Sequence, residues 1–321
     1  MEGAFERRRI ELQELAGGVP QTDDDVVASF ISSVTPGHDA AWMLEYLKRA
    51  CVAHVMGSVI FVHGGLTESA IGRVPGSKDV LESPREWVAS LNEWATRQVA
   101  EYEANPWDGG NSRARAGHGL MDYCVPGGAN GASVVCAGHT KGGNPERVPL
   151  TVSEYLRKGG ITTILCGHTP HGDCPIVQRG GRDGVTVVGG DTSYSDVGAK
   201  SEWGVDNRGS SCVSEIIVRP TGRIEVHGAL SKGQGEVRYA VSGGDAVSGG
   251  DADSDEYVGR ALSDGRWVKA KVVDDEGGGQ GNHRCRYIVF RGKGRELEVE
   301  RLVVQEVEKL ALPPGVDPPQ P

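Results

Sequence analysis

Two short apolar runs, each followed closely by histidine and glycine, stand out in the hydrophobic pattern of the chain. Residues 59–62 are all apolar and lead into His63, and residues 161–165 are mostly apolar and lead through Cys166 and Gly167 into His168. Short apolar runs bounded by turn residues predict buried strands. In open α/β sheets, ligand sites gather at the carboxyl ends of strands. The two histidines are therefore the first candidates for a functional site.

Helical spacing of apolar residues predicts helices at residues 1–16, 22–31, 38–51, 83–104 and 152–158. Thr22 followed by three aspartates is typical of a helix N-cap with an acidic first turn. Ser83 followed by Pro84 combines a cap with the residue preferred at the first helical position. The apolar stripe of the 38–51 helix includes Trp42 and Tyr46.

The second half of the sequence is dominated by short strands, and residues 52–62 predict a hairpin that turns at Gly57. The helix at 152–158, followed by glycines and the strand at 161–165, is typical of a βαβ fragment. We therefore expect an α/β core in the form of an α+β sandwich. Further strands are expected near residues 133–136, 175–178, 185–188, 212–218, 224–227, 236–239, 267–273, 286–290 and 297–304.

Composition shifts predict four parts of the chain. Residues 1–240 are expected to form the main domain and residues 241–255, where Ser-Gly-Gly-Asp-Ala recurs, a low-complexity linker. Residues 256–310 are predicted to form a β-rich extension. The proline-rich residues 311–321 are expected to be a disordered tail.

The net charge of -10 over 321 residues disfavours a nucleic-acid partner, which usually requires a basic face. No apolar run approaches the ~18 residues needed to cross a bilayer, so no membrane span is expected. The seven cysteines are scattered without a CxxC pair, which favours reduced thiols and a cytoplasmic location. Cys166 lies in an apolar strand, where a small hydrophobic residue is more common than a metal ligand.

The strand that leads into His63-Gly64-Gly65-Leu66, the strand that leads into Gly167-His168-Thr169-Pro170, and the segment at 190–195 together resemble calcineurin-like metallophosphoesterases. The likeness is to their serine/threonine-phosphatase-like and diadenosine-tetraphosphatase-like branches and covers roughly residues 40–220. It implies a β-sandwich flanked by helices and a centre of two divalent ions (Mn, Fe or Zn). It also implies that His63 and His168 bind the second ion. The phosphorylated substrate is left open among phosphoproteins, dinucleotides and small phosphoesters.

The first half of that family carries the motifs Asp-x-His, Gly-Asp-x-x-Asp-Arg-Gly and Gly-Asn-His-Asp or Gly-Asn-Arg-Asp. They supply the first ion's aspartate and histidine, the aspartate that bridges the two ions, and an asparagine for the second ion. None of these motifs occurs in this sequence. One expectation is therefore a phosphoesterase chain that lacks its N-terminal βαβ portion. Two alternatives remain open: a non-catalytic remnant that binds a partner or nucleotide, and an artefactual gene product that does not fold alone.

Several further residues are candidates with two interpretations each. His171 is either an acid or phosphate donor facing the substrate, or a solvent-facing loop histidine. Asp173 and Asp191 are candidates to brace the ligand imidazoles, although Asp191 also suits an Asx-turn. Arg208 is either a phosphate-binding residue or part of a plain turn. Two further assignments complete the set: His139 is interpreted as a coincidental copy of the His168 motif, and the glycines beside the ligands as allowing sharp turns.

Overall fold

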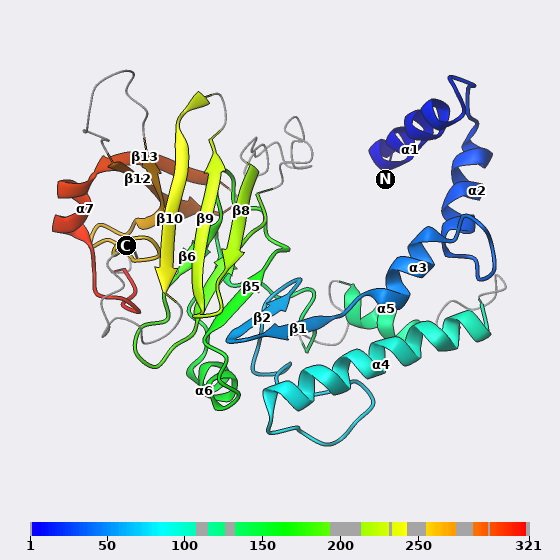
Figure 1. Cartoon of the computed structure of the whole chain (residues 1–321), viewed down its shortest axis with the longest axis horizontal. Helices are drawn as coiled ribbons and strands as arrows, with labels where there is room; N and C mark the ends of the chain where they lie inside the picture. The colour runs from blue at the N-terminus through cyan, green and yellow to red at the C-terminus, as the bar shows by residue number, and fades with distance from the viewer. Residues whose placement is uncertain are drawn as a thin grey trace. The chain divides into compact units, whose positions relative to one another are not determined.

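The computed structural model describes residues 2–106, 115–125, 132–192, 213–230, 233–242, 255–273, 285–294 and 296–318 (Figure 1). Seven helices and three sheets occur in these residues, so the chain has the mixed α/β content that the sequence predicts. The chain divides into two units. The first contains Met1–Cys51 and Glu93–Asp122, and the second contains Val52–Asn92 and Tyr123–Pro321.

The first unit is helical. The predicted cap at Thr22 is confirmed, because its hydroxyl accepts a hydrogen bond from the Asp25 backbone N–H (3.2 Å) and the Asp25 carboxylate accepts one from the Thr22 backbone N–H (2.8 Å). This reciprocal pair satisfies backbone donors that a helix start leaves open. The helices are α1 (Glu2–Leu15), α2 (Asp23–Val34) and α3 (Trp42–Arg49), with part of α4 (Pro84–Ala104) and of α5 (His118–Cys124).

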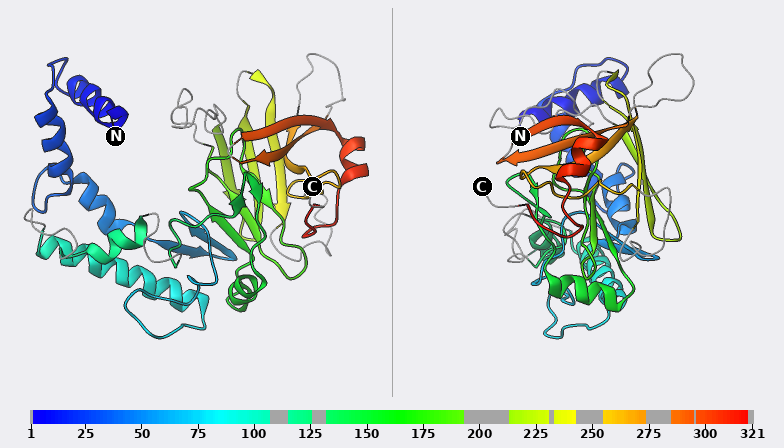
Figure 2. Two further views of the ribbon diagram at one scale, coloured as in Figure 1. Left: turned by 180° about the vertical axis from the view of Figure 1, so that it is seen from behind. Right: turned by 90° about the vertical axis from the view of Figure 1, so that its left-hand side faces the viewer.

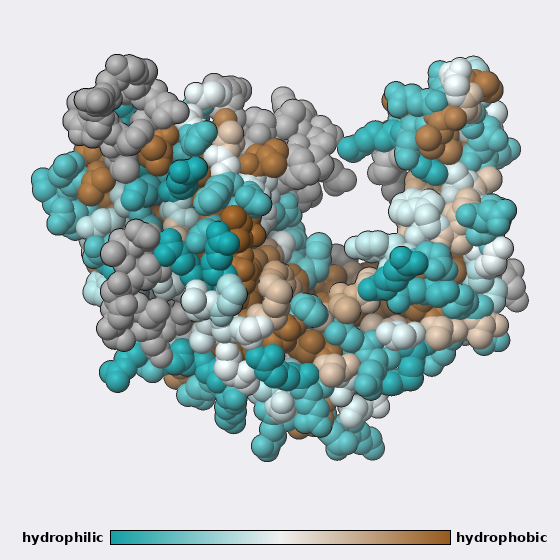
Figure 3. Space-filling model, viewed as in Figure 1, coloured by the Kyte–Doolittle hydropathy of each residue, from teal (hydrophilic) through white to brown (hydrophobic). Residues whose placement is uncertain are grey.

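The core of the helical unit is small. One cluster of buried hydrophobic residues in it contains Ala41, Leu44 and Val99, and Val26 and Trp94 are also buried. Trp42 and Tyr46, expected in the apolar stripe of their helix, are 58% and 68% exposed. The buried residue of α3 is instead Leu44. Hydrophobic surface is visible on this unit in the space-filling view (Figure 3).

The first sheet of the second unit has the strand order β1-β2-β5-β7-β6. Strands β1 and β2 form the predicted hairpin, and Gly57 at its turn has a φ of +58°, which favours glycine. Strands β2, β5 and β7 are parallel, so their carboxyl ends lie at one edge of the sheet. The strands are β1 (Ala53–Met56), β2 (Val59–Val62), β5 (Thr163–Cys166), β6 (Ile176–Gln178) and β7 (Thr186–Gly189), and α6 (Leu150–Lys158) precedes β5.

The second sheet is antiparallel throughout, in the order β13-β12-β11-β10-β9-β8. Strands β10 and β11 pair within it. Residues on both sides of the expected linker at 241–255 therefore belong to one sheet, while 243–254 lie outside the described residues. The strands are β8 (Val213–Val218), β9 (Arg223–Ala229), β10 (Glu236–Ser242), β11 (Trp267–Val273), β12 (Cys285–Lys293) and β13 (Glu296–Val303).

One hydrophobic core joins the two sheets. Val59 and Val188 from the first sheet and Val226, Val268 and Val289 from the second are all buried in it. Two sheets that share their inner faces form a sandwich. Figure 2 shows strands of both sheets in this unit from two further directions.

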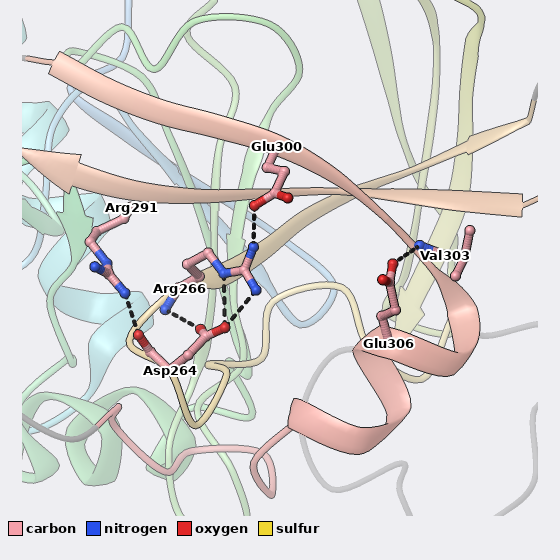
Figure 4. A network of polar contacts seen from close by, with 6 residues as sticks. All are labelled: Asp264, Arg266, Arg291, Glu300, Val303 and Glu306. Atoms are coloured by element: carbon pink, nitrogen blue, oxygen red, sulfur yellow. Dashed lines mark hydrogen bonds and ion pairs between the residues drawn. The ribbon is translucent and has the colours of Figure 1, made fainter.

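Polar contacts tie the loop before β11 to the last two strands (Figure 4). The Arg266 guanidinium donates to the carboxylates of Asp264 (3.0 Å) and Glu300 (2.5 Å). Arg291 donates to the Asp264 carbonyl. Helix α7 (Val304–Leu310) follows β13, and the Glu306 carboxylate accepts the backbone N–H of Val303 (3.0 Å) at its start.

The first residues after α7 are held by the loop before β11. Ala311 forms a β-bridge with Leu262, and the Leu312 backbone N–H donates to the Ala261 carbonyl (2.9 Å). The sequence predicts a disordered tail at 311–321, and residues 319–321 of that prediction lie outside the described residues. The pairing at 311–312 depends on partners about fifty residues earlier, which local composition does not reveal.

Candidate functional site

Three polar side chains follow the three parallel strands of the first sheet. His63 comes directly after β2, His168 lies two residues after β5, and Asp191 lies two residues after β7. Backbone hydrogen bonds continue the ladder beyond the strands, because Gly167 N–H donates to the His63 carbonyl (2.9 Å) and Gly190 N–H to the Cys166 carbonyl (2.8 Å). The structure therefore brings the predicted pair of histidines together at one edge of the sheet.

The two imidazoles meet through their nitrogens. His63 Nε2 lies 3.2 Å from His168 Nδ1, and the ring planes are inclined by 70° with centroids 5.2 Å apart. Two imidazole nitrogens that bind one zinc ion tetrahedrally, each at about 2.0–2.1 Å, are about 3.3–3.4 Å apart. The observed separation is thus suited to a shared divalent ion as well as to a single N–H···N hydrogen bond.

His168 has an unusual backbone conformation, with a φ of +67°. A non-glycine residue in the left-handed region costs roughly 1–2 kcal/mol, although histidine is among the residues enriched there. The pKa of His168 is lowered by burial and then by the neighbouring His63 ring, while the charge of Asp191 opposes both effects. The neutral imidazole, which is the form that binds metal ions, is therefore favoured.

Asp191 and Asp173 lie on different loops around His168. The carboxylate of Asp191 acts on His168 through its charge, and its backbone carbonyl accepts the His171 N–H (3.1 Å). Asp173 is half-buried and lies three residues before β6. Asp191 is thus the carboxylate whose charge favours a cation at His168.

His171 lies in the interior, away from both environments considered for it. It is 2% exposed, and its Nε2–H donates to the Gly143 carbonyl (2.9 Å) while the ring packs edge-on against Phe290. Burial, followed by the charge of Lys269, lowers the pKa of His171 to about 3. The Lys269 ammonium also donates to the His171 carbonyl. These contacts suit a histidine that anchors its own loop rather than one that meets a substrate.

His139, interpreted from sequence as a coincidental motif, lies against the His63 loop. It is 8% exposed, and its Nε2 accepts the backbone N–H of Leu66 (3.1 Å). Burial lowers the pKa of His139 to about 4, so the ring is neutral and able to accept this bond. The repeated Gly-His-Thr pattern thus marked a histidine with a structural role, which is to position the His63 loop through the Leu66 N–H.

A small hairpin carries His139 to this place. Strands β3 (Thr140–Lys141) and β4 (Asn144–Pro145) form it, and the Asn144 side chain both donates to the Gly292 carbonyl (3.0 Å) and accepts the Gly292 N–H (2.8 Å). Together with the bond from His171 to Gly143, these contacts attach the hairpin to β12. The position of His139 therefore depends on the second sheet.

Glycine at position 64 is required by close packing. A Cβ atom there would lie 2.4 Å from the Val135 carbonyl oxygen and 2.5 Å from that of Ala137. At Gly167, a Cβ would meet the His63 carbonyl oxygen at an ordinary 3.5 Å. Neither glycine has a positive φ. The sharp turn expected from the sequence is thus not the reason for glycine at position 64.

His63 and His168 are not joined by a third metal ligand within the described part of the chain. No group of three or more histidine, cysteine, aspartate or glutamate side chains there could hold a metal ion. Burial raises the pKa of the Cys166 thiol to about 12, in keeping with its expected role as a small core residue. Arg208 lies outside the described residues. A divalent ion at His63 and His168 would take its other ligands from water.

A cavity beside the pair is too small for a substrate. It has a volume of about 20 Å³ and is lined by residues that include His139, Cys166, Thr169 and Gln178. A cavity of this size holds about one water molecule. His63 is exposed, so the histidine pair is open to solvent on the side of this residue.

Comparisons with family models, curated proteins and solved structures found no match to this chain. Among the described helices, none has both the length and the apolar character that crossing a bilayer requires.

Proposed function

We propose that this chain binds a divalent transition-metal ion between His63 and His168 as part of a metal-dependent phosphoester hydrolase site of the calcineurin-like type. The supporting observation is the 3.2 Å separation of His63 Nε2 and His168 Nδ1 at the ends of two parallel strands. Imidazole nitrogens suit zinc and iron, and manganese is the third candidate implied by the resemblance.

The residues around the pair have defined tasks in this proposal. His63 and His168 present lone pairs to a common point, and Asp191 adds negative charge that favours a cation there. His139 holds the His63 loop through the Leu66 N–H. A bound ion would supply Lewis-acid stabilisation of the charge that develops on a phosphoester.

Two protein ligands hold an ion weakly, so we propose that this chain by itself has at most trace hydrolytic activity. A two-metal phosphoesterase stabilises both the attacking and the leaving oxygen, and this requires two ions about 3.5–4 Å apart. Among the described residues, no group of three or more histidine, cysteine, aspartate or glutamate side chains could hold such ions. The corresponding experiment measures hydrolysis of p-nitrophenyl phosphate with Mn²⁺ or Zn²⁺. Substantial turnover that disappears in His168→Ala would contradict this limit.

Calorimetric titration with Zn²⁺ and Mn²⁺ tests the metal site directly. We expect one ion per chain, and an affinity roughly tenfold or more weaker in His63→Ala and His168→Ala, since even 1.4 kcal/mol is a factor of ten. His54→Ala is the matched control, because His54 is an exposed histidine on β1. Equal loss of affinity in the control, or unchanged affinity in both ligand variants, would sink the proposal.

Metal binding without hydrolysis would also agree with the alternative of a non-catalytic binding protein. Adding inorganic phosphate to the titration tests whether the metal-loaded chain also accepts a phosphate group. A phosphate that binds the metal-loaded chain and not His168→Ala supports a site for phosphate groups. If phosphate binds neither the metal-loaded wild type nor His168→Ala, the metal would have a structural role only.

A further inference from the structure

The Cys136 thiol lies against the backbone of Cys124, beside the loop that carries His63. The Cys136 Sγ is 3.4 Å from the backbone carbonyl oxygen of Cys124, to which it donates a hydrogen bond, and twelve residues separate the two. Cys124 ends α5 and is exposed, while Cys136 is half-buried. Both are free thiols in this structure. An oxidant can therefore reach one member of a pre-assembled pair.

A second contact holds the same two segments together. The Tyr123 hydroxyl oxygen accepts the backbone N–H of Val134 (3.1 Å), and Tyr123 is 2% exposed. The pair is thus maintained by its surroundings rather than by a chance encounter of loops. Burial, followed by the charge of Cys136, raises the pKa of Cys124, so only a small fraction of this thiol is ionised at neutral pH and its reaction with a peroxide is slow.

The contact places the two residues near the geometry of a covalent bridge. The Cys124 carbonyl oxygen lies about 2.4 Å from its own Cα, as standard backbone geometry requires. The Cys136 sulfur is therefore within about 6 Å of the Cys124 Cα, and the two Cα atoms are within about 9 Å of each other, whereas a disulfide needs them within about 7 Å. The bridge thus requires rotation of the Cys124 side chain and a backbone adjustment of up to about 2 Å.

We propose that Cys124 and Cys136 are a redox modification site that forms a reversible intramolecular disulfide on exposure to a peroxide. The exposed Cys124 thiolate attacks one peroxide oxygen and becomes a sulfenic acid, while the other oxygen leaves as hydroxide and takes up a proton to form water. The Cys136 thiolate then attacks the Cys124 sulfur, and the sulfenic oxygen leaves as a second water. Two thiols and one hydrogen peroxide thus give one disulfide and two waters.

The bridge would act on the segment that covers the His63 loop. The Gly64 N–H donates to the Val134 carbonyl (2.9 Å), and the carbonyl oxygens of Val135 and Ala137 leave no room for a side chain at Gly64. Cys136 lies between these two contacts. Oxidation therefore fixes the cover of the His63 loop to the end of α5, which restricts opening at one side of the histidine pair.

Peptide mapping by mass spectrometry tests the bridge. The full chain is treated with hydrogen peroxide, free thiols are blocked with N-ethylmaleimide, and linked peptides are identified. We expect a Cys124–Cys136 link with a mass loss of about 2 Da in the wild type and in the Cys51→Ser control, whose exposed cysteine is elsewhere. Cys136→Ser should instead trap a Cys124 sulfenic acid that reacts with dimedone. Dimedone adducts in the wild type without a link, or a link to another cysteine, would overturn the proposal.

Two further measurements separate geometry from general reactivity. In urea above the unfolding transition the same treatment should lose the preference for this pair, because the native contact that favours it is gone. Hydrogen exchange at the Gly64 amide should slow on oxidation of the wild type and not of Cys136→Ser. A disulfide that forms without slower exchange would overturn the claimed effect on the His63 loop. Neither result depends on metal binding, so failure of the disulfide proposal can be distinguished from failure of the proposed metal site.

Discussion

His63 Nε2 and His168 Nδ1 lie 3.2 Å apart although 105 residues separate them in the chain. The contact follows from the parallel pairing of β2 with β5, which brings both carboxyl ends to one edge of the sheet. The Gly167 N–H bond to the His63 carbonyl then sets the register beyond the last strand residues. The histidine pair is therefore a product of the sheet and not of flexible loops.

The left-handed backbone at His168 predicts an unusual order of stability. His168→Gly should be more stable than His168→Ala by roughly 0.5–1 kcal/mol, because glycine adopts a positive φ without steric cost. Both variants should lose metal affinity equally. Urea unfolding of the two variants measures the difference in stability, and zinc titration of each measures the loss of affinity. Equal stability of the two would show that the backbone relaxes when the imidazole is removed.

Close packing at Gly64 predicts a difference between the two ligand loops. Gly64→Ala should destabilise the fold by about 1–3 kcal/mol, since its Cβ would meet two backbone oxygens at 2.4 and 2.5 Å. Gly167→Ala is the matched control in the other loop and should be close to neutral, because its Cβ has room. Thermal unfolding of both variants gives the comparison. A Gly64→Ala protein as stable as the control would contradict the packing.

The buried histidines predict a loss of stability in mild acid. His139 has a folded pKa of about 4, below the value of about 6.5 expected for an unfolded chain. Between these values the unfolded state binds the proton that the folded state excludes, so stability falls as the pH falls from about 6.5 towards 4. From pH 7.5 to 5 the contribution of His139 is about 2 kcal/mol.

The measurement is urea unfolding at pH 7.5 and 5. His139→Gln keeps an acceptor near the Leu66 N–H and does not titrate, so its stability should fall less between the two pH values. His54→Ala, which changes an exposed histidine on β1, is unfolded alongside as the control. His171, with a pKa of about 3, adds a dependence of the same sign that remains in His139→Gln. An unchanged pH dependence in His139→Gln would rule out its buried neutral state.

Asn144 predicts how firmly the hairpin is attached. Its side chain makes two hydrogen bonds to the backbone of Gly292, so Asn144→Ala should cost about 1–3 kcal/mol. Asn144→Asp keeps the acceptor for the Gly292 N–H and loses the donor. Its stability should therefore lie between those of the wild type and Asn144→Ala. Hydrogen exchange at the Leu66 amide, which donates to His139, should rise in the same order. If exchange at the Leu66 amide is the same in all three proteins, attachment of the hairpin to β12 does not control the His63 loop.

Sequence patterns predicted the parts of the fold whose causes are local. The Thr22 cap, the hairpin at Gly57 and the strand at residues 59–62 follow from side-chain chemistry within a few residues, as does the strand predicted at 161–165 and found at 163–166. Both histidines were also predicted to stand at the carboxyl ends of apolar strands, where ligand sites gather in α/β sheets. That these two strands are parallel neighbours is a finding of the structure.

The sequence by itself determined which residues stand at the strand ends, because periodicity and turn chemistry act over short distances. The burial of His171 and the contact of His139 with Leu66 were decided by tertiary structure. Both depend on a hairpin that Asn144 joins to Gly292 across 148 residues. The attachment of this hairpin depends on which surfaces meet when the two sheets pack around one core. No local sequence pattern encodes a contact between residues so far apart in the chain. The packing of Gly64 against the 135–137 backbone and of Cys136 against Cys124 was likewise seen only in the tertiary structure.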